Sequence, residues 1–269
     1  MPDAQHHIAR AFIEVRHGRM HVATSGTGFP VLLLHQTPRS WDEYREVLPL
    51  IGESRRAIAM DTPGFGDSEA LPGTPTIEGW AAAALQLMER LGIGRFAVAG
   101  HHTGAAIAAE IAVRAPERVA ALILSACPYV DAARRQHHAG QRVIDDVSER
   151  PDGGHLAELW NRRRPFYPEG DTDLLRRFLA DALRSGPMAV EGHRVVNRYH
   201  MEERIGLIRC PTLVLSPEND PNAQAGPAVA AAIGGSVLRS IPGAQVPFPD
   251  QMPDVFAEQV TGFLHAHGC

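Results

Sequence analysis

The sequence has few cysteines and no long apolar run. Its three cysteines, Cys127, Cys210 and Cys269, are far apart in a chain of 269 residues. This spacing excludes a disulfide framework and a CxxC metal motif, and such sparse cysteine is typical of a reducing compartment. The apolar runs are too short to cross a bilayer, which needs roughly 20 residues. We therefore expect no membrane partner.

The chain also lacks an excess of basic residues. It carries 26 Lys and Arg against 31 Asp and Glu, a formal net charge of −5. A nucleic-acid-binding protein normally shows a basic surplus, so that class is disfavoured. The first seven residues, MPDAQHH, do not form a basic region followed by an apolar one. We therefore expect no signal peptide and a cytoplasmic protein.

What the sequence does contain is an alternation of short apolar runs and helix-compatible segments. Hydrophobic residues make up 44% of the chain and charged residues 21%, which fits a packed globular core. The apolar runs that we interpret as buried strands are residues 31–34, 56–60, 96–99, 119–124, 211–215 and 236–241. The helical segments are residues 40–51, 77–91, 103–115 and 253–267. Alternating strands and helices predict right-handed βαβ units and a mostly parallel sheet.

Two regions depart from this alternation. Residues 12–24 contain two alternating runs around an Arg-His-Gly-Arg turn and predict a leading antiparallel hairpin. Residues 129–206 contain no buried-strand run, only charged helix-compatible segments broken by proline and glycine. We interpret them as a helical insertion. The predicted domains are therefore a core of residues 1–128 and 207–269 and a cap of residues 129–206.

Four polar loops follow the predicted strands at their carboxyl ends, where open parallel sheets place their ligand sites. They begin at His35, Asp61, Gly100 and Ser216, and read HQTP, DTPGFGDS, GHHTG and SPENDP. Together, in this order, they resemble the loops of the α/β-hydrolase superfamily, and the resemblance covers nearly the whole chain outside the insertion. It implies an α/β-hydrolase fold: a mostly parallel eight-stranded sheet flanked by helices, with a helical cap.

The resemblance breaks down at two of the three usual catalytic positions. Members of this family carry a nucleophile at the centre of a GxSxG turn, the nucleophile elbow, and here His102 stands between Gly100 and Gly104. The family's catalytic histidine would align with Val246, while Asp220 matches the family's acid. A Ser–His–Asp acyl-enzyme mechanism cannot run without its serine and its base.

The remaining residues predict another use of the same scaffold. A ring at the elbow could reach Asp220, and the pair would leave one imidazole nitrogen to take a proton from water or from a carbon acid. By the resemblance, the backbone N–H groups of Thr37 and Thr103 would form the oxyanion hole. Direct attack by His102 is a further option, which ranks lower because no second base is evident. Asp131 is the reserve acid should Asp220 point elsewhere.

The pocket around this site is expected to be largely apolar and to take a small molecule. Its predicted lining residues are His35, Gln36, His101, Trp160, Val246 and Phe248. Arg162, Arg163 and Arg164 would bind a substrate carboxylate only if they face inward. No metal-ligand spacing such as HExxH is present, so we expect no metal and no cofactor.

Histidines of the insertion offer a replacement for the missing base. They are His137, His138, His155, His193 and His200. The sequence does not select among them, nor does it distinguish a monomer from a homodimer.

Three functions stay open. The first is hydrolysis of a small ester, lactone, epoxide or similar substrate by water that His102 and Asp220 activate. The second is a non-hydrolytic lyase, cyclase or isomerase reaction in which His102 moves a proton. The third is a small-ligand-binding protein without catalytic activity.

Overall fold

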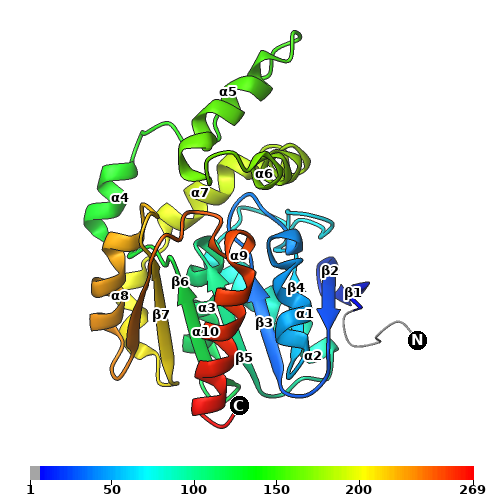
Figure 1. The fold of residues 1–269 in the computed structure, drawn as a ribbon, viewed down its shortest axis with the longest axis vertical. Helices are drawn as coiled ribbons and strands as arrows, with labels where there is room; N and C mark the ends of the chain where they lie inside the picture. Colours follow the sequence, from blue (N-terminus) through cyan, green and yellow to red (C-terminus); the bar gives the residue numbers. More distant parts are fainter. Residues whose placement is uncertain (1–6) are drawn as a thin grey trace.

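A computed structural model describes residues 7–269. Residues 1–6 lie outside the described residues. They begin the predicted core and include most of the segment on which the expectation of no signal peptide rests. Figure 1 shows one sheet with helices on both faces and a group of helices above its upper edge. The strands are β1 (Ala9–Val15), β2 (Gly18–Ser25), β3 (Pro30–Leu34), β4 (Arg56–Met60), β5 (Phe96–His101), β6 (Val119–Ser125), β7 (Thr212–Pro217) and β8 (Val237–Ile241). Their order in the sheet is β1-β2-β4-β3-β5-β6-β7-β8. The predicted eight-stranded sheet is thus confirmed.

The sheet is antiparallel only at its leading edge. β1 and β2 form the predicted hairpin, in which Val15 pairs with Gly18, and β2 then pairs antiparallel with β4. All later pairs are parallel. Consequently the loops that follow β3, β4, β5, β6 and β7 all emerge at one edge of the sheet, the edge beneath the upper helices in Figure 1.

Helices cover both faces of the sheet. They are α1 (Val47–Gly52), α2 (Ile77–Arg90), α3 (Thr103–Arg114), α8 (Gly226–Ala232), α9 (Phe248–Gln251) and α10 (Pro253–Ala266). Within β3, Leu32 and Leu34 pack with α2 and α3, whereas Val31 and Leu33 pack with α1 and α10. This period of two explains why an uninterrupted apolar run predicts a strand buried on both faces.

One predicted helix is divided. Residues 40–51 form the 3₁₀ turn η2 (Trp41–Tyr44) and then α1, rather than a single helix. Pro49 has no N–H, so it cannot donate to the carbonyl of Arg45 as a continuous α-helix requires. The proline is tolerated in the first turn of the separate helix α1.

The insertion, which lies wholly within the described residues, contains helices joined by loops and no β-strand. It holds α4 (Ala132–His138), α5 (Gly154–Arg163), α6 (Thr172–Ser185) and α7 (Met188–Arg198). The short 3₁₀ turns η3 (Arg164–Phe166), η4 (Met201–Glu203) and η5 (Ile205–Leu207) accompany them, and η6 (Ala223–Ala225) follows β7. A separate apolar cluster around Phe178 and Leu175 joins α5 and α6. We infer that these helices act as the cap; none of the described helices is long and apolar enough to span a membrane.

The connection from β5 to α3 depends on two glycines. A Cβ on Gly100 would overlap the backbone oxygen of Gly104, and a Cβ on Gly104 would overlap the backbone oxygen of Leu34. Both obstacles are backbone atoms in the centre of the fold and cannot move aside. The close approach of α3 to β3 and β5 therefore requires glycine at both positions.

We expect Gly104→Ala to destabilise the protein by about 3 kcal/mol or more, because overpacking against backbone cannot relax. Gly94→Ala is the matched control, since a Cβ on Gly94 meets no atom within 4 Å. Urea unfolding followed by circular dichroism would measure both changes. Equal stability of the two variants would contradict this account of the turn.

Candidate active site

His102 lies at the sharp turn between β5 and α3. Its backbone has φ 49° and ψ −111°, a conformation that non-glycine residues rarely adopt. The turn is held by the His102 N–H, which donates to the Ser125 carbonyl oxygen at 3.0 Å. The side chain is half-buried, with 18% of its surface exposed. The turn thus projects an imidazole from the carboxyl edge of the sheet.

The imidazole of His102 is hydrogen-bonded through both nitrogens. Nε2 lies 2.6 Å from Asp220 Oδ2, and Nδ1 lies 3.0 Å from the side-chain nitrogen of Asn222. The Asn222 backbone N–H also donates to Asp220 Oδ1 at 2.7 Å. Because the carboxylate can only accept and the amide nitrogen can only donate, Nε2 carries the proton and Nδ1 keeps its lone pair.

Asp220 is held as a carboxylate. Burial raises the pKa of Asp220, but the neighbouring His102 and the hydrogen bonds that the carboxylate accepts outweigh it and lower that pKa below its usual value. Its side chain is fully buried behind the ring. The structure therefore brings together the two residues that the sequence nominated as base and acid, while their catalytic role stays a prediction.

The predicted oxyanion turn lies beside the elbow. The Thr37 N–H donates to Thr103 Oγ1 at 3.3 Å, and the Thr103 hydroxyl donates to Thr37 Oγ1 at 3.0 Å. The Thr103 N–H opens α3 and is one of the N–H groups that no carbonyl of the same helix can satisfy. Thr37 and Thr103 thus contact each other through their side chains, and the Thr103 hydroxyl receives one of the two predicted donors.

Gln36 fixes the shape of this turn through two hydrogen bonds. Its backbone N–H donates to Glu43 Oε2 at 2.9 Å, and its side-chain amide donates to Glu43 Oε1 at 2.5 Å. Glu43 is buried, and burial raises its pKa to about 8. The side chain is accommodated because Glu43, a buried acceptor on η2, receives the side-chain amide of Gln36 as well as its backbone N–H.

A cavity of about 220 Å³ lies above the elbow, between the core and the helices of the insertion. The core contributes Gln36, Thr37, His102, Thr103, Pro128, Pro221, Asn222 and Val246. The insertion contributes Arg134, Ile144, Arg163, Phe166, His193, Val196 and Asn197. Of the six predicted lining residues, the structure brings Gln36 and Val246 to this cavity.

His35 and His101, in contrast, are packed inside the core, and the expectation that they line the pocket does not match the structure. His35 Nδ1 bonds to the Gln36 carbonyl oxygen at 2.8 Å, and Nε2 accepts the Thr62 N–H at 2.9 Å. His101 lies 2.9 Å from Ser125 Oγ and 2.8 Å from the Val246 carbonyl oxygen. Burial lowers the pKa of His101 to about 3, so this ring is neutral.

The two aromatic residues predicted to line the pocket also lie elsewhere. Phe248 begins α9 and packs against Phe256 in the core cluster shared with α1 and α10. Trp160 lies on α5 and faces a different depression, together with Tyr167 and Leu175. Neither position could be decided from the sequence, because each depends on which face of a short helix meets the core.

The insertion does bring one histidine to the cavity. His193, on α7, lies 2.8 Å from Asp145 Oδ2, and Asp145 is buried. Arg163 also faces inward and binds both oxygens of Asp145 through Nε and Nη2. Asp131 instead accepts the Arg134 N–H at 2.8 Å and caps α4, so it is not beside His102. Asp145, Asn197 and Asn222 carry no motif that would have selected them in advance.

The donor atoms near the elbow do not favour a metal ion. His101, His102 and Asp220 lie close enough together to be considered as ligands. However, both nitrogens of His101 are already hydrogen-bonded, one of them to the Val246 carbonyl oxygen, which requires a ring N–H. His101 therefore cannot offer a lone pair without losing a buried hydrogen bond, and the set is a poor fit for a metal.

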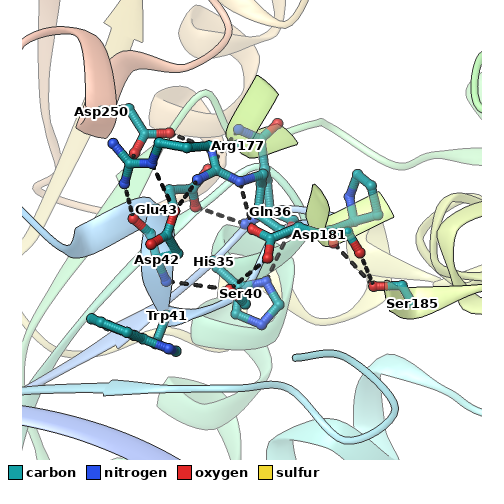
Figure 2. Close-up of polar contacts among 12 residues, drawn as sticks. His35, Gln36, Ser40, Trp41, Asp42, Glu43, Arg177, Asp181, Ser185 and Asp250 are labelled. Atoms are coloured by element: carbon teal, nitrogen blue, oxygen red, sulfur yellow. Dashed lines mark hydrogen bonds and ion pairs between the residues drawn. The ribbon is translucent and has the colours of Figure 1, made fainter. Parts of the chain in front are cut away.

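A buried ion cluster ties the turn after β3 to the insertion (Figure 2). Arg39 is fully buried and binds three carboxylates: Asp42 at 3.3 Å, Asp181 of α6 at 2.8 Å, and Asp250 of α9. Arg177 of α6 joins the same cluster through Asp42 at 2.7 Å and Asp250 at 3.1 Å. The cation of Arg39 thus fixes three parts of the chain around the oxyanion turn.

Known proteins resemble this chain in sequence and in fold. The family model for the alpha/beta hydrolase fold matches residues 30–222, well over half of the chain. Among curated proteins, the soluble epoxide hydrolase of Corynebacterium sp. (strain C12) is 39% identical over 90 residues, 34% of this chain. The 2-hydroxymuconate semialdehyde hydrolase of Pseudomonas sp. (strain CF600) is 34% identical over 110 residues, 39% of this chain. The matches span 32% and 39% of these two relatives, so the chain covers less than half of their length.

Solved structures resemble the chain over nearly its whole length. The enol-lactonase from Burkholderia xenovorans LB400 has a TM-score of 0.79 and 19% identity, covering 95% of this chain and 100% of that one. A hydrolase from Pseudomonas aeruginosa PA01 has a TM-score of 0.81 and 21% identity, covering 95% and 98%. At these identities the likeness concerns the fold.

Arg39→Met should lower the free energy of unfolding by about 3–5 kcal/mol, because it leaves buried carboxylates without their cation. Arg176→Met is the control: Arg176 pairs with Asp173, both side chains are more than half exposed, and such a pair contributes about 1 kcal/mol or less. Chemical denaturation of both variants gives the comparison. A cost for Arg39→Met no larger than for Arg176→Met would refute a structural role for the cluster.

The lowered pKa of Asp220 predicts a pH-dependent stability. A carboxyl group whose pKa is lower in the folded state stabilises the fold above its unfolded value, and that contribution is lost as the pH falls through the folded value. Asp220→Asn should therefore cost about 1–3 kcal/mol at neutral pH, with the difference from wild type shrinking below the ordinary value of 3.8. Glu89→Gln, at an exposed position on α2, serves as control. Urea titrations at several pH values test this, and a pH-independent difference would contradict it.

Proposed function

The chain belongs to the α/β-hydrolase fold family, and from that premise we propose that it hydrolyses a small organic substrate with His102 as general base. The substrate class would be an ester, a lactone, an epoxide or a similar electrophile. The observation that carries this proposal is the 2.6 Å contact between His102 Nε2 and the buried Asp220, at a ring that lines a cavity.

The arrangement of protons assigns the reacting nitrogen. Nε2 holds its proton toward Asp220, so the lone pair that can accept a proton is on Nδ1. In the resting structure Nδ1 receives the amide of Asn222 at 3.0 Å. A water molecule must replace that amide before Nδ1 can activate it. In the reaction, the water oxygen bonds to the electrophilic carbon while its proton passes to Nδ1. The bond from that carbon to the leaving oxygen then breaks, and the imidazolium returns the proton to this oxygen.

Charge that develops on the substrate oxygen would be received by the amides of Thr37 and Thr103. Preorganised donors of this kind each contribute roughly 3–4 kcal/mol to transition-state stabilisation in characterised enzymes. The present Thr37 contact, 3.3 Å to the Thr103 hydroxyl, is long and weak enough for an oxyanion to displace. An acyl-enzyme route is not proposed, because position 102 supplies no hydroxyl and position 246 supplies no base.

A second candidate is proton transfer without hydrolysis, as in an isomerase, lyase or cyclase. The observation that favours it is the second histidine–carboxylate pair, His193 and Asp145, which reaches the same cavity from the opposite, helical side. Two such pairs could remove a proton from one atom of a substrate and deliver one to another. This candidate requires no water in the reaction.

Hydrolysis of a panel of aryl esters and lactones between roughly pH 5 and 9 tests the first candidate. Wild type should turn over some of them, and the rate should fall in acid, since a protonated base cannot accept a proton. His102→Ala should lose about 100-fold or more, the usual contribution of a general base.

His137→Ala is the matched control for this assay, because His137 is an exposed histidine of α4 outside the cavity. It should retain the wild-type rate. Turnover that survives in His102→Ala would refute His102 as the base. Rates equal to buffer in wild type would refute hydrolysis of these substrates and favour proton transfer or ligand binding.

A further inference from the structure

The cavity above the elbow is lined by cationic and neutral side chains only. Among its described lining residues are two arginines and two histidines, and none is aspartate or glutamate. The carboxylates that accompany this site, Asp220 and Asp145, stand behind the two histidines rather than in the lining. The described lining of this cavity thus contains two guanidinium groups and no aspartate or glutamate.

The two arginines of the lining differ in how they are neutralised. Arg163 binds both oxygens of the buried Asp145, so its charge is already paired. Arg134 makes no ion pair within residues 7–269; its side chain donates only to Asn197 Oδ1 at 3.2 Å and Asn222 Oδ1 at 3.5 Å. Burial lowers the pKa of Arg134, and the nearby Cys127 and Asp131 offset this effect only in part. Several of its N–H donors remain available to a ligand.

Arg134 is also close to the reacting group. Asn222, which accepts from Arg134 through Oδ1, donates to His102 Nδ1 through Nδ2. A single amide thus separates the guanidinium from the imidazole nitrogen that we assign as the base. An anion bound to Arg134 would compete for the contact that holds Asn222 in place, next to the atoms that react.

A wider groove of about 1000 Å³ adjoins the cavity and shares Arg134, Ile144, His193 and Asn197 with it. The groove adds four arginines, each near a carboxylate: Arg135 with Glu202, Arg142 with Glu158, and Arg194 and Arg198 with Glu191. Asp146 lines the groove as well, 3.9 Å from Arg194, so the other charges of the groove are paired. Arg134, which lines both the groove and the cavity, differs from these four arginines because it forms no ion pair with a described residue.

We propose that Arg134 binds a carboxylate of the substrate and holds it beside His102, so that the substrate is a small organic acid rather than a neutral molecule. A single guanidinium fork matches the two oxygens and the single charge of a carboxylate. The inference rests on the proposed function for the reacting end of the substrate. It makes Arg134 a residue that determines specificity.

Pentanoate and pentanamide test the proposal, because they have nearly the same shape and differ in charge. Their dissociation constants can be measured by NMR titration of the ¹⁵N-labelled full chain. Wild type should bind pentanoate about tenfold or more tightly than pentanamide, the usual gain from a charge-assisted hydrogen bond. Arg134→Gln should remove that preference.

Two further variants keep the test decisive. Arg134→Lys retains the charge without the planar fork and should keep part of the preference, which a merely structural residue would not do. Arg142→Gln removes an exposed arginine of the groove and should keep the full preference. Equal binding of both probes by wild type, a preference that survives in Arg134→Gln, or an equal loss in Arg142→Gln would overturn the proposal.

The failure of this inference can be told apart from the failure of the proposed function. Binding of pentanoate by wild type needs no turnover, so it is measured separately from ester hydrolysis. A preference for pentanoate in a protein that hydrolyses none of the esters would support carboxylate binding by Arg134 and contradict the proposed hydrolysis. Ester hydrolysis without a preference for pentanoate would support the proposed hydrolysis and contradict carboxylate binding by Arg134.

Discussion

The guanidinium of Arg39 has no exposed surface, and three carboxylates from different parts of the chain surround it. Asp42 belongs to η2 and Asp181 to α6 of the insertion, while Asp250 lies in α9, just after the loop that carries Val246. Removing a cation and several anions from water is costly, and the cost is offset only if every partner stays in position. The cluster therefore penalises any displacement of α6 or α9 relative to the turn that holds Gln36 and Thr37.

This constraint extends to the predicted oxyanion turn. The side-chain amide and the backbone N–H of Gln36 both donate to Glu43, one residue away from Asp42 of the ion cluster. The Val246 carbonyl oxygen receives His101 at 2.8 Å and Gln36 at 3.5 Å. Position 246, which aligns with the family's catalytic histidine, thus contributes a backbone carbonyl oxygen that connects the elbow to the final loop.

The parts of the fold that depend on local sequence could be predicted, and those that depend on distant partners could not. Buried strands follow from apolar runs, and the elbow follows from a pattern of five consecutive residues in which Gly100 and Gly104 flank position 102. The pairing of His102 with Asp220 could be anticipated because both follow parallel strands, whose ends meet at one edge. The inward position of His35 depends on Thr62, and that of His193 on Asp145, contacts which only the folded chain defines.

The backbone of His102 bears on the proposal that the elbow has a chemical role. A non-glycine residue in such a conformation costs about 1–3 kcal/mol, and glycine in its place would remove most of that cost. The structure nevertheless holds an imidazole there, with Nε2 on a buried carboxylate and Nδ1 bonded to the amide of Asn222, which itself lines the cavity. A purely structural histidine would be expected to resemble His101, fully buried and neutral with both nitrogens bound inside the core. The contrast between these adjacent rings is the physical reason to look for the chemistry at His102.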